Sequence, residues 1–434
     1  MKNFLFSLFA FLFLGCFLSP PSKTGSPDAP LQQACFTPGC VVQSACQLFY
    51  EAQGSIYLSM YHLDHPQILH CLKQNTERSL DIQVVTDLSH ADPAIFSNLV
   101  HRGVKLFPGS ENGLMHNKYL IIDRQKVLTG SANFSTSLES SHNLTLLFHS
   151  PSLASYYLKD FSAYQSYRFG SEKTLPLETL TADSLTHPDP IPFFTPYLGQ
   201  YSDFYTGGPF QSLDKHPLPV YEDLAEWGSN QSFTANGIWE RGIDLDQDQI
   251  NDLYLKDIKK GEEILSPSKV IYQLGPLPTD ISQAHQNALN ALLFFVGQAR
   301  ESLTLAAYSL TEPTLLGYFN KLARAKKIRL TILMDYQQAK TMRGNSLSLL
   351  LELQRNCSCV FLYQNPGKTL HHKFIYLDKQ KLLAGSLNFS TSAFTSNDEN
   401  FLFLEDTSSF KLFLEREINT LLSHSLPLSL DSQP

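Results

Sequence analysis

The stretch LMHNKYLIIDRQKVLTGSANFS, residues Leu114–Ser135, occurs again in diverged form as TLHHKFIYLDKQKLLAGSLNFS, residues Thr369–Ser390. Each copy carries a His, a Lys two residues later, an Asp five residues after the Lys, and then Gly-Ser-x-Asn-Phe-Ser. The probability that two matches at this spacing arise by chance in one chain is negligible. The recurring pairs are His116 with His371, Lys118 with Lys373, Asp123 with Asp378, Gly130 with Gly385, Ser131 with Ser386, Asn133 with Asn388, and Ser135 with Ser390.

The sequence around each motif is also repeated. The alternating segment SIYLSMY at 55–61 predicts a half-buried strand and matches LTLAAY at 303–308. Helical patterns separate these strands from further strand-like runs, which indicates an α/β layered fold. In a chain of 434 residues, the repeat predicts two half-domains, at residues 41–169 and 279–424.

The segment between the halves, residues 170–278, does not repeat and is rich in Pro, Gly, Tyr and Phe. It predicts an insertion with irregular or β-rich structure, of the kind that often forms lids or binding loops. An acidic loop within it offers a candidate Ca²⁺ site, although a solvated loop is favoured because the Gly and Glu of an EF-hand are missing. The candidate ligands are Asp244, Asp246, Asp248 and Asp252.

The N-terminus predicts export. Residues 1–16 combine a cationic start with an apolar run, Phe4–Leu14, that is too short to span a membrane. Phe13-Leu14-Gly15-Cys16 resembles a bacterial lipoprotein box, which implies a membrane anchor; ordinary cleavage nearby and an uncleaved apolar tail remain alternatives. Residues 17–40, rich in Pro and Ser, predict a flexible tether. We therefore expect an exported protein, either a membrane-anchored lipoprotein or a periplasmic or secreted one.

Cysteine content and net charge narrow the possible metal sites and binding partners of the protein. Of seven cysteines, six lie beyond Cys16, an even number that permits three disulfides of undetermined connectivity in an oxidising compartment. No histidine lies at zinc-finger spacing near them, so structural thiols or disulfides are favoured over a metal site. The net charge of −8 disfavours nucleic acid as a partner, although a local basic cleft would still permit it.

The motif spacing has a chemical interpretation. On a strand, residues two apart share a face, so His116 and Lys118 point together, while Asp123 has the opposite parity. We therefore expect Asp123 and its counterpart Asp378 to support the site rather than react. The Gly-Ser turn places Asn133, and likewise Asn388, where an amide can reach an anion.

Two such half-sites brought together about a pseudo-two-fold axis suit a phosphodiester. Lysine and amide donors would stabilise the oxygens of a five-coordinate phosphorus. One imidazole would attack in line to form a phosphohistidine, and the other would protonate the leaving oxygen and then activate water or an alcohol. The scheme requires no cofactor or metal, and no oligomer, because one chain carries both half-sites. The expected phosphate-binding residues are Lys118, Lys373, Asn133, Asn388, Ser131 and Ser386.

The two motifs resemble the HKD motifs of the phospholipase D superfamily, and the similarity covers roughly residues 41–168 and 281–422. The resemblance implies two pseudo-symmetric α/β/α lobes with a catalytic cleft at their interface. It implies a catalytic set of His116, Lys118, Asp123, His371, Lys373 and Asp378.

Members of this superfamily often place a carboxylate downstream of the second Asn to orient a catalytic histidine. Glu399 matches that position, whereas the same offset in the first half falls on Leu144. His116 is therefore expected to lack a carboxylate partner. Family habit favours His116 as the nucleophile, while support from Glu399 would favour His371.

The sequence thus predicts a phosphodiesterase that cleaves or transfers phospholipid head groups at a membrane. An exported endonuclease acting on DNA or RNA and a cardiolipin-synthase-like transphosphatidylase are alternatives of the same mechanism. A non-enzymatic effector or adhesion protein is a further alternative. Intact motifs in both halves argue against the last, because a scaffold has no need of paired His and Lys.

Overall fold

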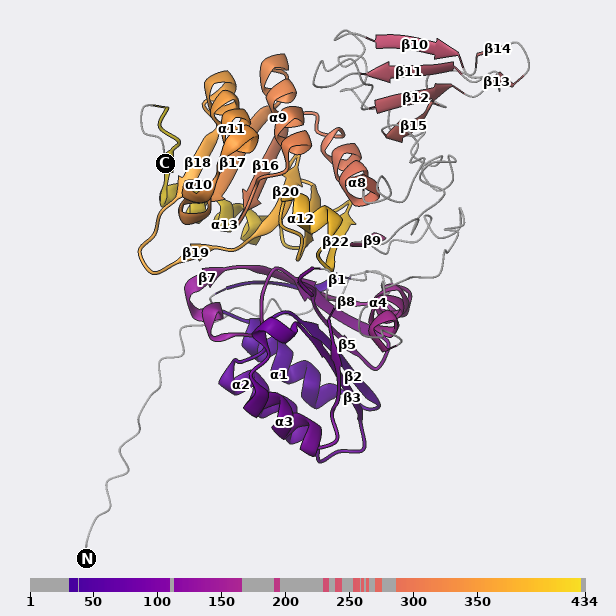
Figure 1. Cartoon of the computed structure of the whole chain (residues 1–434), viewed down its shortest axis with the longest axis vertical. Coiled ribbons are helices and arrows are strands. Elements are labelled where there is room, and N and C mark those ends of the chain that lie inside the picture. The colour runs from indigo at the N-terminus through magenta and orange to yellow at the C-terminus, as the bar shows by residue number, and fades with distance from the viewer. Residues whose placement is uncertain are drawn as a thin grey trace, which may run out of the picture.

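A computed structural model describes residues 31–37, 39–109, 113–165, 191–195 and 286–430, together with six short strands between residues 229 and 274 (Figure 1). The predicted export signal, most of the predicted tether and the acidic loop lie outside these residues. Within the described part, no helix combines the length and apolar character needed to cross a membrane.

The first half forms a seven-stranded mixed sheet in the order β1-β8-β6-β5-β2-β3-β4. Strands β2, β3 and β4 are parallel to one another, and β5 joins β2 in the antiparallel direction. The strands are β1 (Leu31–Phe36), β2 (Ser55–Met60), β3 (Asp81–Thr86), β4 (Lys105–Pro108), β5 (Lys118–Ile122), β6 (Lys126–Gly130) and β8 (Leu144–His149).

The second half repeats this plan in an eight-stranded sheet, β23-β18-β17-β16-β20-β21-β22-β9. The run β8-β6-β5-β2-β3-β4 corresponds to β22-β21-β20-β16-β17-β18, which confirms the predicted duplicated α/β fold. The strands are β9 (Ile191–Thr195), β16 (Ser302–Ala307), β17 (Arg329–Asp335), β18 (Val360–Tyr363), β20 (Lys373–Leu377), β21 (Lys381–Gly385), β22 (Glu399–Leu404) and β23 (Ser425–Pro427).

Helices cover both faces of each sheet. The strands carry apolar residues on both faces, and the helices bury them. Ile56 and Leu58 pack outward with helices of the first lobe, while Tyr57 lies in the core shared by the two lobes. The outer helices are α1 (Val41–Glu51), α2 (Pro66–Asn75) and α3 (Pro93–His101) in the first lobe, and α8 (Gln286–Val296), α9 (Pro313–Ala325) and α11 (Gly344–Cys357) in the second.

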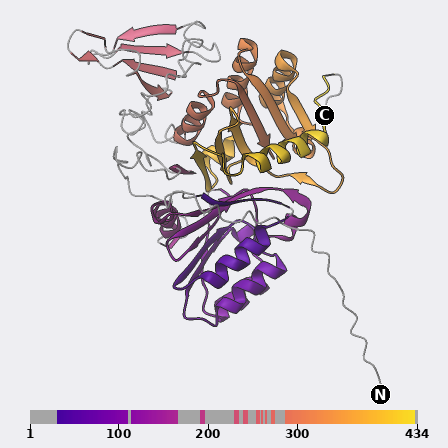
Figure 2. The same cartoon turned by 180° about the vertical axis from the view of Figure 1, so that it is seen from behind.

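One helix from each lobe fills the space between the sheets. These helices, α4 (Pro151–Gln165) and α13 (Lys411–Ser423), share one apolar core with side chains from both sheets. Tyr119 and Phe374, from the central strands of the two lobes, belong to that core. Figures 1 and 2 show the lobes stacked against each other along this layer. The lobes therefore share buried apolar surface, which favours a fixed relative position.

Each sheet gains an edge strand from a segment that was not predicted to join it. Residues 31–36, predicted as tether, form β1 and pair with β8. Residues 191–195, within the predicted insertion, form β9 and pair with β22. The tether prediction was wrong at its C-terminal end, because these short strands satisfy the exposed backbone groups of β8 and β22. Cys35, Phe193 and Phe194 are buried there.

The rest of the insertion contains short antiparallel strands. Strands β10 (Ser229–Phe233), β11 (Trp239–Ile243), β12 (Leu253–Asp257) and β15 (Val270–Leu274) form a four-stranded sheet. A separate two-stranded pair joins β13 (Lys259–Lys260) to β14 (Glu263–Ile264). The sequence expectation of β-rich structure agrees with these strands.

The six described cysteines form three disulfides. They join Cys35 to Cys40, Cys46 to Cys71, and Cys357 to Cys359. The second links α1 to α2, and the others close short local loops. The spacing of the cysteines along the chain allowed many pairings, and only the folded structure shows which pairs form.

Candidate active site

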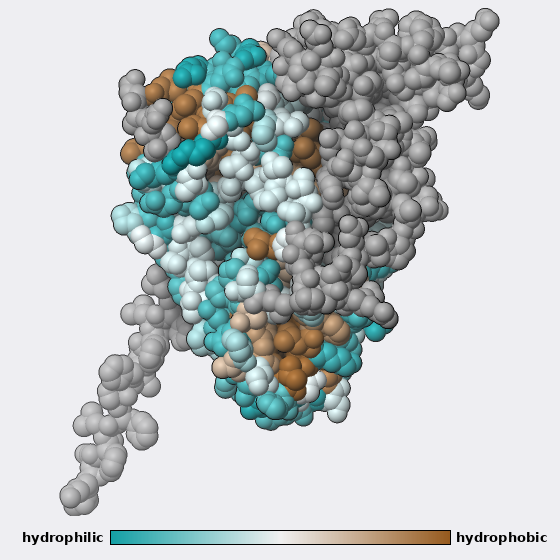
Figure 3. Space-filling view, viewed as in Figure 1, coloured by the Kyte–Doolittle hydropathy of each residue, from teal (hydrophilic) through white to brown (hydrophobic). Residues whose placement is uncertain are grey.

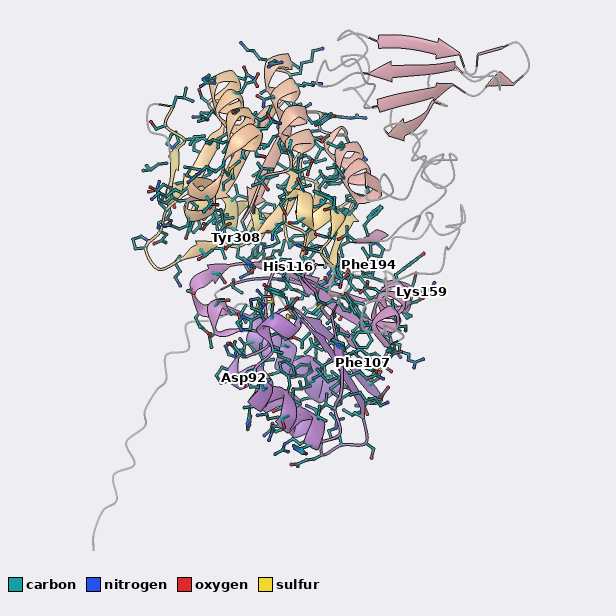
Figure 4. All side chains as sticks on the ribbon, in the orientation of Figure 1. Asp92, Phe107, His116, Lys159, Phe194 and Tyr308 are labelled. Atoms are coloured by element: carbon teal, nitrogen blue, oxygen red, sulfur yellow. A yellow bond between two sulfur atoms is a disulfide. The ribbon has the colours of Figure 1, made fainter. Side chains whose placement is uncertain are left out.

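The two motif histidines are held across the lobe interface by backbone hydrogen bonds. The N–H of His116 donates to the carbonyl of Asp398 at 2.9 Å, and the N–H of His371 donates to the carbonyl of His142 at 3.0 Å. A short parallel pair, β7 (Ser141–His142) with β19 (Thr369–Leu370), reinforces the second contact. Each motif histidine is therefore positioned by the opposite half of the chain. In Figure 4, His116 and Tyr308 lie where the lobes meet.

Glu399 supports His116, which corrects the expectation that His116 would have no carboxylate partner. The His116 Nδ1 lies 2.7 Å from Glu399 Oε1. The other carboxylate oxygen, Oε2, accepts a hydrogen bond from Ser386 Oγ at 2.6 Å. Both His116 and Glu399 are buried. The carboxylate is thus fixed by the second lobe and aimed at the histidine of the first.

The partner of His371 is Asn143. Its Oδ1 lies 2.7 Å from His371 Nδ1 and accepts from Ser131 Oγ at 3.1 Å. The two supporting pairs are therefore Ser386–Glu399 for His116 and Ser131–Asn143 for His371. The first pair ends in a carboxylate and the second in a neutral amide.

The sequence offset matched Leu144 with Glu399. This match was wrong, because the strand register differs between the two lobes. In the first lobe Gly130 pairs with Thr145, whereas in the second Gly385 pairs with Phe401. The first half is thus one residue shorter between its Gly-Ser and the following strand. A shift of one residue reverses which side chains face the cleft, so Leu144 packs in the interlobe core and its neighbour faces the histidine.

The two motif lysines are buried beside the histidines. Lys118 Nζ donates to the carbonyl of His116 at 2.6 Å, and Lys373 Nζ donates to that of His371 at 3.0 Å. Burial lowers the pKa of Lys118 to about 7. Burial, and then the charge of Lys118, lower the pKa of Lys373 well below its usual value. A bound anion would stabilise the charged forms of both lysines.

The surroundings also shift the acid–base equilibria of the histidines and the carboxylate. Burial and the two lysine charges lower the pKa values of both His116 and His371, which favours their neutral forms. Burial raises the pKa of Glu399 to about 8, although Lys118 and Lys373 act to lower it. A positively charged His116, 2.7 Å away, would favour the ionised form of Glu399.

Two tyrosines that the motif analysis missed line the same site. The ring of Tyr61 lies 4.8 Å from that of His116, and Lys118 Nζ lies 5.0 Å from its centroid. Tyr308 repeats this arrangement with His371 at 4.9 Å and Lys373 at 5.2 Å. The sequence carried a signal for them, because both tyrosines end the matched strand segments.

The structure supports a positioning role, rather than phosphate binding, for the motif serines. Besides donating to Glu399, Ser386 Oγ accepts from the backbone N–H of Asn400 at 2.9 Å. Ser131 Oγ likewise accepts from the N–H of Leu144 at 3.1 Å. These hydroxyls are already engaged.

The motif asparagines retain polar atoms for a ligand. Asn133 and Asn388 are half-buried, and the Oδ1 of each has no hydrogen-bond partner among the described residues. The oxygen and nitrogen of an amide are interchangeable in such an assignment, so each side chain can present a donor instead. Binding of a phosphoryl oxygen by these amides remains a prediction.

The motif aspartates lie at the far ends of the central strands. Asp123 accepts hydrogen bonds from the backbone N–H groups of Gln53, Gly54 and Ser55 at 2.7–2.9 Å. Asp378 repeats this with the N–H groups of residues 300–302. The strand separates Asp123 from Lys118 by about 16 Å, at about 3.3 Å per residue. The expected supporting role therefore fits the geometry better than a catalytic one.

Replacing Asp123 with Ala is expected to lower the free energy of unfolding by about 2–4 kcal/mol, because three backbone donors lose a charged acceptor. Turnover per folded molecule should change by less than about two-fold, as Asp123 does not reach the reacting groups. Urea denaturation and kcat measured on the same preparation test both statements. Asp378→Ala is the matched control in the second lobe. A folded variant with a kcat reduced about 100-fold would contradict this assignment.

Comparison with known proteins identifies the class. A family model described as "Cardiolipin synthase, PLD-like domain" matches residues 45–164 and 292–421, more than half of the chain. The chain therefore belongs to the phospholipase D-like family.

Individual relatives resemble parts of the chain. The mouse protein named mitochondrial cardiolipin hydrolase is 32% identical over 142 residues, which cover 32% of this chain and 62% of that protein. A Rickettsia conorii protein named phospholipase D is 29% identical over 197 residues, covering 45% of this chain and 88% of its own length. A structure of phosphatidylserine synthase from Haemophilus influenzae aligns with a TM-score of 0.51 and 15% identity over 92% of this chain and 89% of that one. At that identity it supports the fold alone.

Proposed function

We propose that this protein is a phosphodiesterase of phospholipase D type, which cleaves or transfers phospholipid head groups through a phosphohistidine intermediate. The observation that carries the proposal is the pairing of His116 with Glu399 and of His371 with Asn143, each across the lobe interface. In both pairs the partner engages Nδ1. The Nε2 of each ring is then the nitrogen available for chemistry.

The different partners favour different roles for the two histidines. The nucleophile gains positive charge when its Nε2 bonds to phosphorus, and a carboxylate at Nδ1 stabilises that charge. This favours His116 as the nucleophile. Asn143 orients His371 without adding a charge, and the negative charge of a bound phosphodiester favours the protonated imidazole that donates to the leaving oxygen.

The reaction then proceeds in two balanced steps. In the first, Nε2 of His116 bonds to phosphorus, the bond from phosphorus to the leaving oxygen breaks, and His371 gives that oxygen its proton. In the second, His371 takes a proton from water or an alcohol as that oxygen bonds to phosphorus and the bond to His116 breaks. Lys118 and Lys373, with the two motif asparagines, stabilise the phosphoryl oxygens throughout.

Several features favour a phospholipid over nucleic acid as the substrate. The mouse and Rickettsia relatives are named for action on cardiolipin and as phospholipase D. The net charge of −8 disfavours a polyanionic duplex. Leu114, two residues before His116, is 39% exposed and offers an apolar contact beside the site. We further propose that residues 1–16 direct export and that lipidation of Cys16 can hold the enzyme at a membrane.

Incubating the purified protein with phosphatidylcholine vesicles, cardiolipin vesicles and plasmid DNA tests the substrate class. Head-group or phosphatidate release by the wild type, absent from a His116→Ala control, supports the proposal. DNA cleavage without lipid turnover would overturn the lipid assignment in favour of a nuclease. Adding a primary alcohol separates hydrolysis from transfer, because transfer yields a phosphatidyl alcohol. Transfer would favour the synthase activity that the family description names.

Anion affinity is expected to fall as pH rises above about 7. Burial lowers the pKa of Lys118 to about 7, so its positive charge is present below that pH and lost above it. A bound phosphodiester favours the charged form, so binding should take up a proton near pH 8. Calorimetric titration with a non-hydrolysable phosphonate analogue, in buffers of different ionisation enthalpy, measures this uptake. Lys118→Arg should reduce this proton uptake. An affinity of the wild type that stays constant from pH 6.5 to 9 would refute the predicted pH dependence.

A further inference from the structure

A second polar cluster lies directly behind His371. It joins His142, at the end of β7, with His372, which precedes β20, and with Glu417 on α13. His142 Nδ1 and His372 Nε2 lie 2.7 Å and 2.9 Å from the same oxygen, Glu417 Oε1. The three donor atoms all lie within 4.8 Å of one another. The cluster therefore draws one ligand from the first lobe and two from the second.

The equivalent place in the other lobe is built differently. Behind His116, the matching residues are Asn117 and Asp160, whose side chains lie 3.3 Å apart, and Tyr119 donates to the same carboxylate at 2.5 Å. Asp398 stands where the second cluster has His142, by the same register that matches Asn143 with Glu399. An amide, a phenol and carboxylates suit a hydrogen-bonded network. Two imidazoles facing one carboxylate oxygen instead offer donor atoms of the kind that bind zinc.

We propose that His142, His372 and Glu417 form a binding site for a divalent transition metal such as Zn²⁺, which ties the two lobes together behind the second motif histidine. The ligands would be His142 Nδ1, His372 Nε2 and Glu417 Oε1. Two histidines and one glutamate are an established donor set for zinc, with a water completing the tetrahedron. The Glu417 side chain is 12% exposed, which leaves an edge from which ion and water can enter.

The surroundings of the cluster fit this role. Tyr363 Oη lies 2.9 Å from His142 Nε2, so it can accept the N–H of a ring that binds metal through Nδ1. Metal binding through His372 Nε2 places its proton on Nδ1, which has no acceptor among the described residues. This unpaired N–H weakens the site, so micromolar metal is appropriate for the test.

The test measures metal bound to the full, tag-free chain after chelator treatment and dialysis against micromolar ZnCl₂. The wild type should retain one Zn²⁺ per chain by elemental analysis, and its Tm should rise by about 5 °C. Binding of Co²⁺ in its place should give the visible absorption of a tetrahedral site. No stoichiometric metal under these conditions would overturn the proposal and leave the cluster as a hydrogen-bonded network.

Matched variants locate the metal. His372→Asn, which copies Asn117 of the first lobe, and Glu417→Gln should each lose the stoichiometric ion. His65→Asn is the control, since His65 is also buried, has an Nδ1 without a partner among the described residues, and lies outside the cluster. If His372→Asn and Glu417→Gln retain the ion, the site is elsewhere and the proposal fails. The proposed chemistry is tested separately, because His116→Ala should lose turnover while keeping the metal.

Discussion

Replacing either motif histidine with Ala is expected to reduce turnover of a natural phospholipid by at least about 10⁴-fold. Loss of His116 removes the proposed nucleophile, and loss of His371 removes the proton donor for the leaving oxygen. Head-group release, measured at saturating substrate, reports both losses. Circular dichroism and Tm show whether each variant is folded, which matters because both side chains are buried or half-buried at the lobe interface.

A substrate with a good leaving group separates the two roles. p-Nitrophenolate leaves a p-nitrophenyl phosphodiester without protonation, so His371→Ala should regain much of its first step and release a burst of p-nitrophenolate. His116→Ala should show no burst, because no covalent intermediate can form. Wild type and His371→Ala quenched in alkaline denaturant, in which the phosphorus–nitrogen bond is stable, should carry a phosphoryl group on His116 when mapped by mass spectrometry. Phosphate on His371, with a burst in His116→Ala, would reverse the assignment.

Glu399→Gln is expected to lower kcat by about 10²–10⁴-fold while changing KM little. The substitution keeps the size of the side chain but removes the charge that stabilises phosphorylated His116. It also lets an amide N–H face His116 Nδ1, which favours the wrong tautomer. Asn143→Ala, the matched change behind His371, should cost only about ten-fold, since it removes an orienting contact without a charge.

The variant Asn143→Asp sharpens this comparison. A carboxylate 2.7 Å from His371 Nδ1 would raise the pKa of that histidine, so the limb of the kcat profile that reports the proton donor should move to higher pH. Steady-state kinetics from pH 5 to 9 on all three variants measures these effects. Equal losses in Glu399→Gln and Asn143→Ala would contradict distinct roles for the two histidines.

The chemistry of the site was largely predictable from the sequence, because the motif residues are local in the chain. The duplication placed His116 and His371 in matching α/β halves, and the parity of Asp123 indicated that it supports rather than reacts. The partners of the histidines were not predictable, since they come from the opposite half. Their identity depends on strand register, which differs by one residue between the lobes.

The edge strands and the disulfides escaped prediction for a related reason. The segment 31–36 is short and lies in a polar, Pro-containing stretch, and only the open edge of β8 makes it a strand. Segment 191–195 has the same relation to β22. Contacts that satisfy a distant part of the molecule leave no periodic pattern of their own in the sequence.

The crossed support of the two histidines has a consequence for how such a site can change over time. In an assembly of two identical half-chains, one residue would have to serve behind both histidines, and any substitution would alter both at once. With both halves in one chain, Glu399 and Asn143 can differ. Because both halves are in one chain, the residue behind each histidine can be substituted independently. The carboxylate behind one histidine and the amide behind the other are the result of such independent substitution.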